Sequence, residues 1–202
     1  MTVNGKEADV QEFNRRAATY EDSRKQSYFF DRVQRAVLNL AETQTRPDAV
    51  LDVGCGTGRL LRKAKELWPE ARLIGVDAAE KMIEQASRLF PEAEFHAAMA
   101  ESLPLPDASV DLAFSTLSFH HWINQAKGVS EVARVLRPGG RFLLADIALP
   151  FGLSVFNHHF SQNSPKRIRE KFVATGLLVD LQQRRWRWSR FLVVTVGRKP
   201  SA

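Results

Sequence analysis

The sequence predicts a single α/β domain over residues 1–202, in which a doubly wound, mostly parallel sheet carries helices on both faces. Short, nearly all-apolar segments alternate with segments of helical periodicity between residues 49 and 146. Strands that are apolar at consecutive positions are typical of parallel sheets, which are buried on both faces. One apolar segment runs into a glycine-rich turn at residues 54–58 and then into a helical pattern. A chain of 202 residues is long enough for one domain with one large core.

The beginning of the chain is predicted to be helical. Phe13, Ala17 and Tyr20 share the spacing of one helix face, and residues 29–40 carry an apolar stripe at i, i+4, i+7, i+8 and i+11. Pro47 then interrupts this pattern, and we expect a buried strand directly after it.

The core elements follow in alternation. We expect strands at residues 49–53, 72–76, 93–97, 110–115 and 141–146, and helices at residues 57–67, 79–90 and 125–136. Residues 137–140 (RPGG) are predicted to form a turn before the last of these strands. A further helix is expected at residues 165–175, and the β-rich runs at residues 177–181 and 190–196 are predicted to pair as an antiparallel hairpin. Right-handed crossovers place the carboxyl ends of parallel strands along one edge, where ligands of such sheets bind.

The composition is that of an ordinary globular protein, with 44% hydrophobic and 26% charged residues. Cys55 is the only cysteine, so no internal disulfide can form and nothing indicates an oxidising compartment. The first ten residues lack the basic start and apolar run of a secretory signal. No segment approaches the roughly 18 apolar residues that a membrane span needs. We therefore expect a soluble, cytoplasmic protein.

The formal net charge of +6 is concentrated near the C-terminus. Lysine and arginine far outnumber acidic residues over 166–199, and residues 184–190 (RRWRWSR) interleave arginine with tryptophan. Such a surface can attract acidic ligands, and its mixture of rings and cations can hold single-stranded nucleic acid. The interpretation we favour is a hairpin with its tryptophans on the sheet and its arginines in solvent.

The segment most informative about function is residues 50–58, VLDVGCGTG. Gly54, Gly56 and Gly58 permit a tight turn and let a ligand approach bare backbone. The helix N-terminus just beyond them offers free N–H groups to an anion. Asp52 ends the strand, where its carboxylate can meet a cationic group of a ligand. The alternative is a tight strand-to-helix connection with no ligand.

Asp77 ends the second strand, nineteen positions after Gly58. A carboxylate at that place can accept both ribose hydroxyls of an adenosine group. The alternative, which is compatible with it, is an N-cap for the following helix. A dinucleotide site prefers a third glycine one position later, so the spacing disfavours a nicotinamide oxidoreductase.

These motifs together resemble the class I S-adenosylmethionine-dependent methyltransferases, particularly the small-molecule type related to the ubiquinone/menaquinone C-methyltransferases. The matching segments are residues 51–58 (LDVGCGTG), 75–78 (GVDA) followed by Met82, 100–111 (AESLPLPDASVD) and 134–140 (RVLRPGG). The likeness covers residues 13–146 well and the tail loosely. It implies a Rossmann-like sheet of seven strands, the last of them antiparallel, with S-adenosylmethionine as cofactor and S-adenosylhomocysteine as product.

The resemblance also implies roles for individual residues. Gly54, Gly56 and Gly58 would cradle the methionine part of the cofactor, Asp52 would lie near its ammonium group, and Asp77 would hold the ribose. The remaining contacts it implies are Ala78 and Met82 on the adenine ring, Ala100 and Glu101 at the adenine edge, and Ser115 and Thr116 facing the methionine and sulfonium.

Two further features concern the rim of this pocket. The family often has an acidic residue that binds the adenine amino group at the position of Met99, so adenine recognition here would rely on backbone groups and apolar packing. Tyr20 resembles a tyrosine of the family's entry helix that reaches the cofactor, or it packs on the sheet. The domain would thus divide into a helical lid at residues 1–45, a cofactor-binding core at 46–146, and substrate-side helices with the hairpin at 147–202.

His120 and His121 lie just after the fourth strand, where a substrate would approach. They are our first and second candidates for a general base, although methyl transfer from an activated donor needs a base only for acceptors of high pKa. The alternative is that both are framework residues. No spacing of histidine, cysteine and carboxylate residues indicates a metal site, and none is expected.

We therefore expect methyl transfer to a small-molecule partner. The alternatives are an RNA or protein methyltransferase that uses the basic C-terminal face, and a non-catalytic module that keeps the cofactor fold. Residues 115–118 (STLS) stand where nucleic-acid amino-methyltransferases have Asp/Asn-Pro-Pro-aromatic, which disfavours a nucleic-acid partner. No long exposed apolar seam predicts an oligomer.

Overall fold

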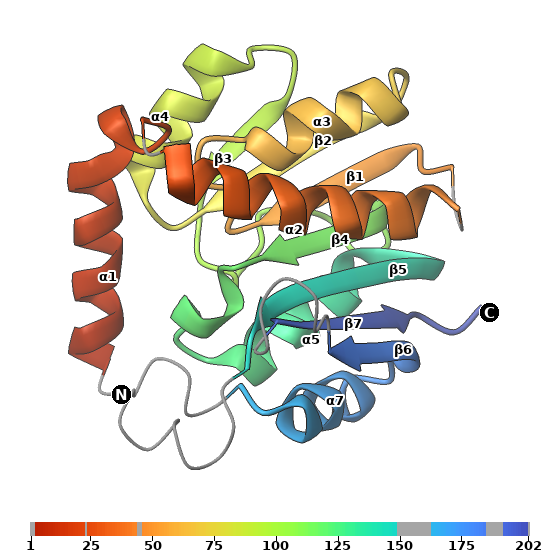
Figure 1. Ribbon diagram of the computed structural model, residues 1–202. Coiled ribbons are helices and arrows are strands. Elements are labelled where there is room, and N and C mark those ends of the chain that lie inside the picture. Colours follow the sequence, from red (N-terminus) through yellow and green to blue (C-terminus); the bar gives the residue numbers. More distant parts are fainter. Residues whose placement is uncertain (1–2, 23, 44–45, 149–162, 185–191, 202) are drawn as a thin grey trace.

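A computed structural model confirms the doubly wound α/β architecture (Figure 1) and describes residues 3–22, 24–43, 46–148, 163–184 and 192–201. Its single sheet has the strand order β3-β2-β1-β4-β5-β7-β6. The strands are β1 (Ala49–Val53), β2 (Arg72–Asp77), β3 (Glu94–Ala97), β4 (Val110–Thr116), β5 (Leu136–Ile147), β6 (Leu178–Arg184) and β7 (Leu192–Arg198). The first five strands pair in parallel, whereas β7 runs antiparallel to both β5 and β6. The order reverses between β1 and β4, and this switch point is where such sheets bind ligands.

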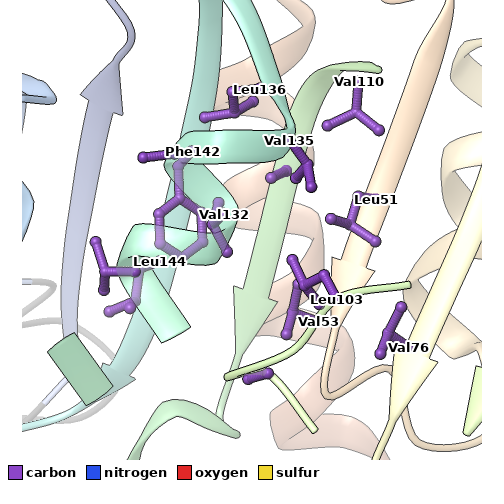
Figure 2. Close-up of a cluster of buried hydrophobic side chains, with 14 of the residues drawn as sticks. Leu51, Val53, Val76, Leu103, Val110, Val132, Val135, Leu136, Phe142 and Leu144 are labelled. Carbon is purple, nitrogen blue, oxygen red and sulfur yellow. The ribbon is translucent and has the colours of Figure 1, made fainter. Parts of the chain in front are cut away.

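The helices cover the two faces of the sheet. They are α1 (Val3–Arg16), η1 (Ala17–Thr19), α2 (Arg24–Glu42), α3 (Arg59–Leu67), α4 (Glu80–Leu89), η2 (Phe119–His121), α5 (Gln125–Val135) and α7 (Pro165–Ala174). Buried side chains of α2 and α3 pack on one face together with Val50 and Phe114. Those of α5 and α7 pack on the other face with Leu51 and Val53, part of which Figure 2 shows. Consecutive side chains of β1 therefore pack in the cores on opposite faces of the sheet. For this reason the whole strand is apolar apart from Asp52.

Helix α1 has a different place. It runs across the carboxyl ends of the parallel strands instead of along a face of the sheet (Figure 1). Phe13 and Tyr20, from α1 and the turn that follows, pack on a small cluster formed by Ala17, Ala79 and Met82. The N-terminal segment therefore closes over the edge at which the strands end.

Some boundaries differ from the sequence-based prediction. Helix α3 begins at Arg59, two residues late, because Gly58 is left-handed with a φ of 75°. The predicted turn at residues 137–140 instead lies within β5, where Gly139 donates to the Lys199 carbonyl and Gly140 accepts from the Lys199 N–H. The hairpin is confirmed, with strands at 178–184 and 192–198. Most of the arginine–tryptophan run lies between them, outside the described residues.

The segment between β3 and β4 has no helix in the structure and is fixed by one arginine. Arg134 donates to the carbonyl oxygens of Leu103 and Leu105 at 3.0 and 2.8 Å. Its guanidinium is in turn held by Glu131 at 2.8 Å and Asp107 at 2.7 Å. This clamp holds the chain that forms one wall of the cleft described below. None of the described helices is long and apolar enough to cross a membrane.

Candidate active site

A cleft opens where β1, β2 and β4 end, and the space in it, together with the open solvent at its mouth, is about 1060 Å³. Most residues predicted to bind a cofactor line it: Tyr20, Asp52, Gly54, Gly56, Asp77, Ala78, Met82, Met99, Ala100, Glu101 and Thr116. Two of the predicted residues, Gly58 and Ser115, do not. The sheet topology accounts for this grouping, because neighbouring parallel strands bring residues distant in sequence to one edge.

The three glycines of the turn have different physical roles. All have positive φ, at 76°, 54° and 75° for Gly54, Gly56 and Gly58. A side chain at Gly54 would overlap Ser118, and one at Gly58 would lie 2.9 Å from the Phe95 ring. Of the three, Gly56 faces the most open space, because the nearest neighbour of a Cβ atom placed there would be the Tyr20 ring at 4.0 Å. Gly54 and Gly58 therefore allow close packing, and Gly56 exposes backbone to the cleft.

We predict that Gly54→Ala and Gly56→Ala differ in their effects. Both place a side chain in left-handed backbone, at a cost of about 1–2 kcal/mol. Only Gly54→Ala must also displace Ser118, so it should lower the free energy of unfolding by clearly more than Gly56→Ala does. Urea denaturation of the two variants beside wild type measures this. Equal losses would show that the contact with Ser118 does not constrain the turn.

Asp52 brings a carboxylate to the base of the cleft. The residue is 2% exposed, and its Oδ1 atom has no hydrogen-bond partner among the described residues. Burial, and then the nearby Asp77, raise its pKa to about 8. A buried carboxylate of this kind is costly to ionise unless a cation binds beside it.

Asp77 organises the neighbouring backbone. Its two carboxylate oxygens accept from the Gly56 N–H and the Ala79 N–H, each at 2.8 Å. The bond to Ala79 closes a turn directly before α4, but the N-cap of that helix is Ala79, so the predicted N-cap role of Asp77 is wrong. Burial raises its pKa, and the two backbone hydrogen bonds partly counteract that rise. Each oxygen has a second acceptor position for a ligand hydroxyl.

The end of β4 differs from the prediction in detail. Ser115 is fully buried and its hydroxyl lies 2.9 Å from that of Ser118. Ser118, which the sequence did not single out, lines the cleft and donates to the Val53 carbonyl at 3.0 Å. Leu117 also lines the cleft and has a positive φ of 56°. Such strained backbone is found preferentially at functional sites.

The two candidate histidines lie in different environments. His120 is 8% exposed and does not line the cleft, and its Nδ1 atom is 2.7 Å from Asp146. His121 lines the cleft, and its Nδ1 atom is 3.0 Å from Asp9 of α1. The two rings are stacked at a tilt, with centroids 4.0 Å apart. Burial, and then His120, lower the pKa of His121 to about 4. Of the two candidates, the second, His121, is therefore the one that lines the cleft.

The other wall of the cleft is less polar. Ala78, Met82, Met99 and Ala100 lie there together. Glu101 accepts from the Asn124 N–H at 2.7 Å, so its carboxylate already supports the start of α5. This apolar part of the lining, between Asp77 and Glu101, can hold a flat ring by packing.

Ionic contacts fasten the N-terminal segment to the start of α3. Glu21 accepts from the Thr57 hydroxyl and from Arg62, each at 2.6 Å. Arg59, which lines the cleft, lies 3.6 Å from Glu21 and 3.7 Å from Asp31 of α2. Burial raises the pKa of Glu21, but the hydrogen bonds from Thr57 and Arg62 outweigh it and lower the pKa overall. Within the described part of the chain, no group of histidine, cysteine and carboxylate residues is arranged to hold a metal.

Comparison with known proteins gives consistent matches. A family model described as a methyltransferase domain matches residues 51–144. Malonyl-[acyl-carrier protein] O-methyltransferase of Dechloromonas aromatica is 31% identical over 187 residues, which cover 86% of this chain and 67% of that protein. Demethylmenaquinone methyltransferase of Symbiobacterium thermophilum is 35% identical over 120 residues, covering 55% and 48%.

A solved structure matches nearly the whole chain. It is a chain from the complex between the Haloferax volcanii Trm112 methyltransferase activator and a methyltransferase, with a TM-score of 0.76 and 25% identity. The match covers 94% of this chain and 98% of that one. The chain spans 30–50% of the length of the first curated relatives that it matches.

Proposed function

The chain belongs to the class I S-adenosylmethionine-dependent methyltransferases, and from this we propose that it transfers a methyl group from S-adenosylmethionine to a small-molecule acceptor, releasing S-adenosylhomocysteine. The observation that carries the proposal is the buried Asp52 carboxylate beside Asp77 at a glycine turn, whose Oδ1 atom has no hydrogen-bond partner among the described residues. S-adenosylmethionine, when bound, supplies a methyl group on a sulfonium centre that is already activated for displacement.

The residues around the turn fit such a ligand. The Asp52 carboxylate complements the ammonium group, because burial and the nearby Asp77 raise its pKa and a cation bound beside it would favour its ionised form. Asp77 has acceptor positions for the ribose hydroxyls, and its bonds to Gly56 and Ala79 already fix their direction. The apolar wall formed by residues 98–100 and Met82 accommodates the adenine ring, in place of the acidic partner absent at Met99.

His121 is the residue we assign as general base. The assignment rests on its position in the cleft, where it can accept the proton that the acceptor atom loses; its pKa of about 4 leaves the imidazole unprotonated but weakly basic at neutral pH. Helix α1, the first part of the predicted lid at residues 1–45, excludes water from the cleft because it lies across the strand ends, whereas α2 packs on a face of the sheet.

The acceptor side of the cleft favours an uncharged, ring-like molecule. The lining residues near His121 include Phe13, Leu117, Trp122 and Ile123. Arg59 is the only lysine or arginine among the described lining residues, and it is ion-paired with acidic residues of the N-terminal segment. Of the two relatives, the one named for demethylmenaquinone is therefore the better guide to the acceptor than the one named for a malonyl group.

Thermal unfolding tests the cofactor assignment. We expect S-adenosylmethionine and S-adenosylhomocysteine to raise the melting temperature, because a ligand at a hundred times its dissociation constant adds about 2.7 kcal/mol to stability. NAD at the same concentration serves as the control and should have no effect. Incorporation of labelled methyl groups into a panel of quinols, phenols and carboxylic acids then tests the acceptor class. A shift with NAD alone, or with none of the three, would refute the proposed function.

A further inference from the structure

Helix α1 bridges the two rims of the cleft through polar contacts. Asn14 accepts from the Lys81 N–H in the first turn of α4 at 2.9 Å, on the side where Asp77 ends β2. Asp9, more than one turn earlier, lies 3.0 Å from His121 on the opposite side. Figure 1 shows the same helix running across the strand ends. One helix therefore contacts both the predicted cofactor side and the predicted acceptor side.

The contact between Asp9 and His121 is well shielded from solvent. The two side chains are 17% and 27% exposed, and the Phe13 ring packs edge-on against the imidazole with centroids 5.0 Å apart. A hydrogen bond in such surroundings is stronger and more directional than one at the surface. The two residues are 112 positions apart in the sequence, so their contact depends on α1 lying across the cleft.

We propose that Asp9 is a positioning residue for His121, so that closure of α1 over the cleft also orients the base. The proposal rests on the proposed function, since orientation of His121 matters only where that residue accepts a proton. A carboxylate can only accept a hydrogen bond, so it fixes the imidazole hydrogen on Nδ1 and leaves the lone pair on Nε2. His121 is therefore held in the tautomer that a base needs only while α1 lies over the cleft and Asp9 contacts the ring.

The titratable groups around His121 indicate that Asp9 acts by fixing the orientation and tautomer of the imidazole and not by changing its charge. Asp9 faces it from α1, His120 from the same 3-10 turn, and Asp146 of β5 lies beyond His120. Burial and His120 depress the pKa of His121, whereas Asp9 and Asp146 act in the opposite direction. Removing Asp9 should therefore lower that pKa further and leave the ring neutral. What is lost is the fixed tautomer.

Nuclear magnetic resonance of the ring nitrogens tests this without a known acceptor. In ligand-free protein with ¹⁵N-labelled histidine, at about pH 7 where the ring is neutral, we expect the His121 signals of the Nδ1–H tautomer. His121→Gln identifies those signals. Asp9→Ala should convert the ring mainly to the Nε2–H tautomer, and Asp9→Glu should restore the Nδ1–H form at least in part. Glu12→Ala, an exposed carboxylate on the same helix, is the matched control and should change nothing.

The outcomes separate this inference from the proposed function. An Nε2–H tautomer in wild type, or an unchanged tautomer in Asp9→Ala, overturns the role of Asp9 whether or not the protein binds S-adenosylhomocysteine. Absence of S-adenosylhomocysteine binding to wild type would overturn the proposed function, and the tautomer would still be readable. If both proposals hold, Asp9→Ala keeps the wild-type dissociation constant for S-adenosylhomocysteine and loses methyl transfer.

Discussion

Asp52→Asn is expected to stabilise the ligand-free protein and at the same time to weaken its binding of S-adenosylmethionine. Both effects come from the same buried carboxylate, whose Oδ1 atom has no partner in the described structure. An ionised group in that position costs more free energy than a neutral amide of the same shape. The ionised form is nevertheless what a bound ammonium group needs.

The effect on stability should depend on pH with a definite sign. Burial, and then Asp77, raise the pKa of Asp52 from 3.8 to about 8, so between these values the folded protein binds a proton that the unfolded chain releases. The stabilisation from that proton is complete below the lower value and is lost as pH rises through the upper one. Urea denaturation should therefore show that the free energy of unfolding of Asp52→Asn, relative to that of wild type, increases as pH rises from about 5 to about 8.5. A difference that does not change with pH would contradict this account.

Binding of the cofactor should show the opposite preference. Because the carboxylate must ionise, the affinity of wild type for S-adenosylhomocysteine should rise as pH increases from about 6 to 8, by up to about tenfold per pH unit. Asp52→Asn should bind weakly and without this slope. Glu84→Gln, which removes an exposed carboxylate from α4, is the matched control and should follow wild type. Calorimetry at several pH values measures all three proteins.

The core of the fold and the cofactor side of the cleft were predictable because their signals are local. Strands β1, β2 and β4 are short, mostly apolar runs, and the core on both faces of the sheet contains their buried side chains. Asp52 is the second-last residue of β1 and Asp77 the last of β2, so the pairing of β1 with β2 brings them to one edge. The positions of Asp52 and Asp77 could therefore be predicted from the apolar pattern and the strand order alone, without knowledge of side-chain contacts.

The acceptor side was less predictable because its contacts are long-range. His120 and His121 are neighbours in a single 3-10 turn, where consecutive side chains point in directions about 120° apart. The sequence does not show which of them faces the cleft. Which ring faces the cleft depends on two contacts between distant parts of the chain. Asp146 of β5 holds His120, and Asp9 of α1 holds His121. Ser118 was missed for the same reason, since its partner Val53 is 65 positions away.

The glycine turn shows a different limit. Its three glycines form one motif in the sequence, yet only Gly56 faces the cleft without a close protein neighbour. The requirement at Gly58 comes from Phe95 of β3, which packs against the start of α3. A ligand and a neighbouring ring impose the same demand for a missing side chain, so the pattern alone does not distinguish them.

Asp77→Ala is expected to weaken binding of S-adenosylhomocysteine by roughly 1.5–3 kcal/mol, or about 10- to 150-fold in the dissociation constant. The variant loses the acceptors for the ribose hydroxyls and also leaves the N–H groups of Gly56 and Ala79 without their carboxylate partner. The second loss should lower the melting temperature as well. Glu80→Ala removes the next carboxylate in the chain, which is exposed, and should leave both quantities unchanged.

A double-mutant cycle separates the two contributions of Asp77. Wild type should bind the 2′-deoxyribose analogue of S-adenosylhomocysteine more weakly than S-adenosylhomocysteine itself, because one hydrogen bond to the carboxylate is missing. Asp77→Ala should bind the two ligands about equally, since loss of a hydroxyl matters only while its acceptor is present. If the variant still distinguishes the ligands as wild type does, the ribose hydroxyl contacts another group. In that case Asp77 acts on binding only through the backbone of Gly56 and Ala79.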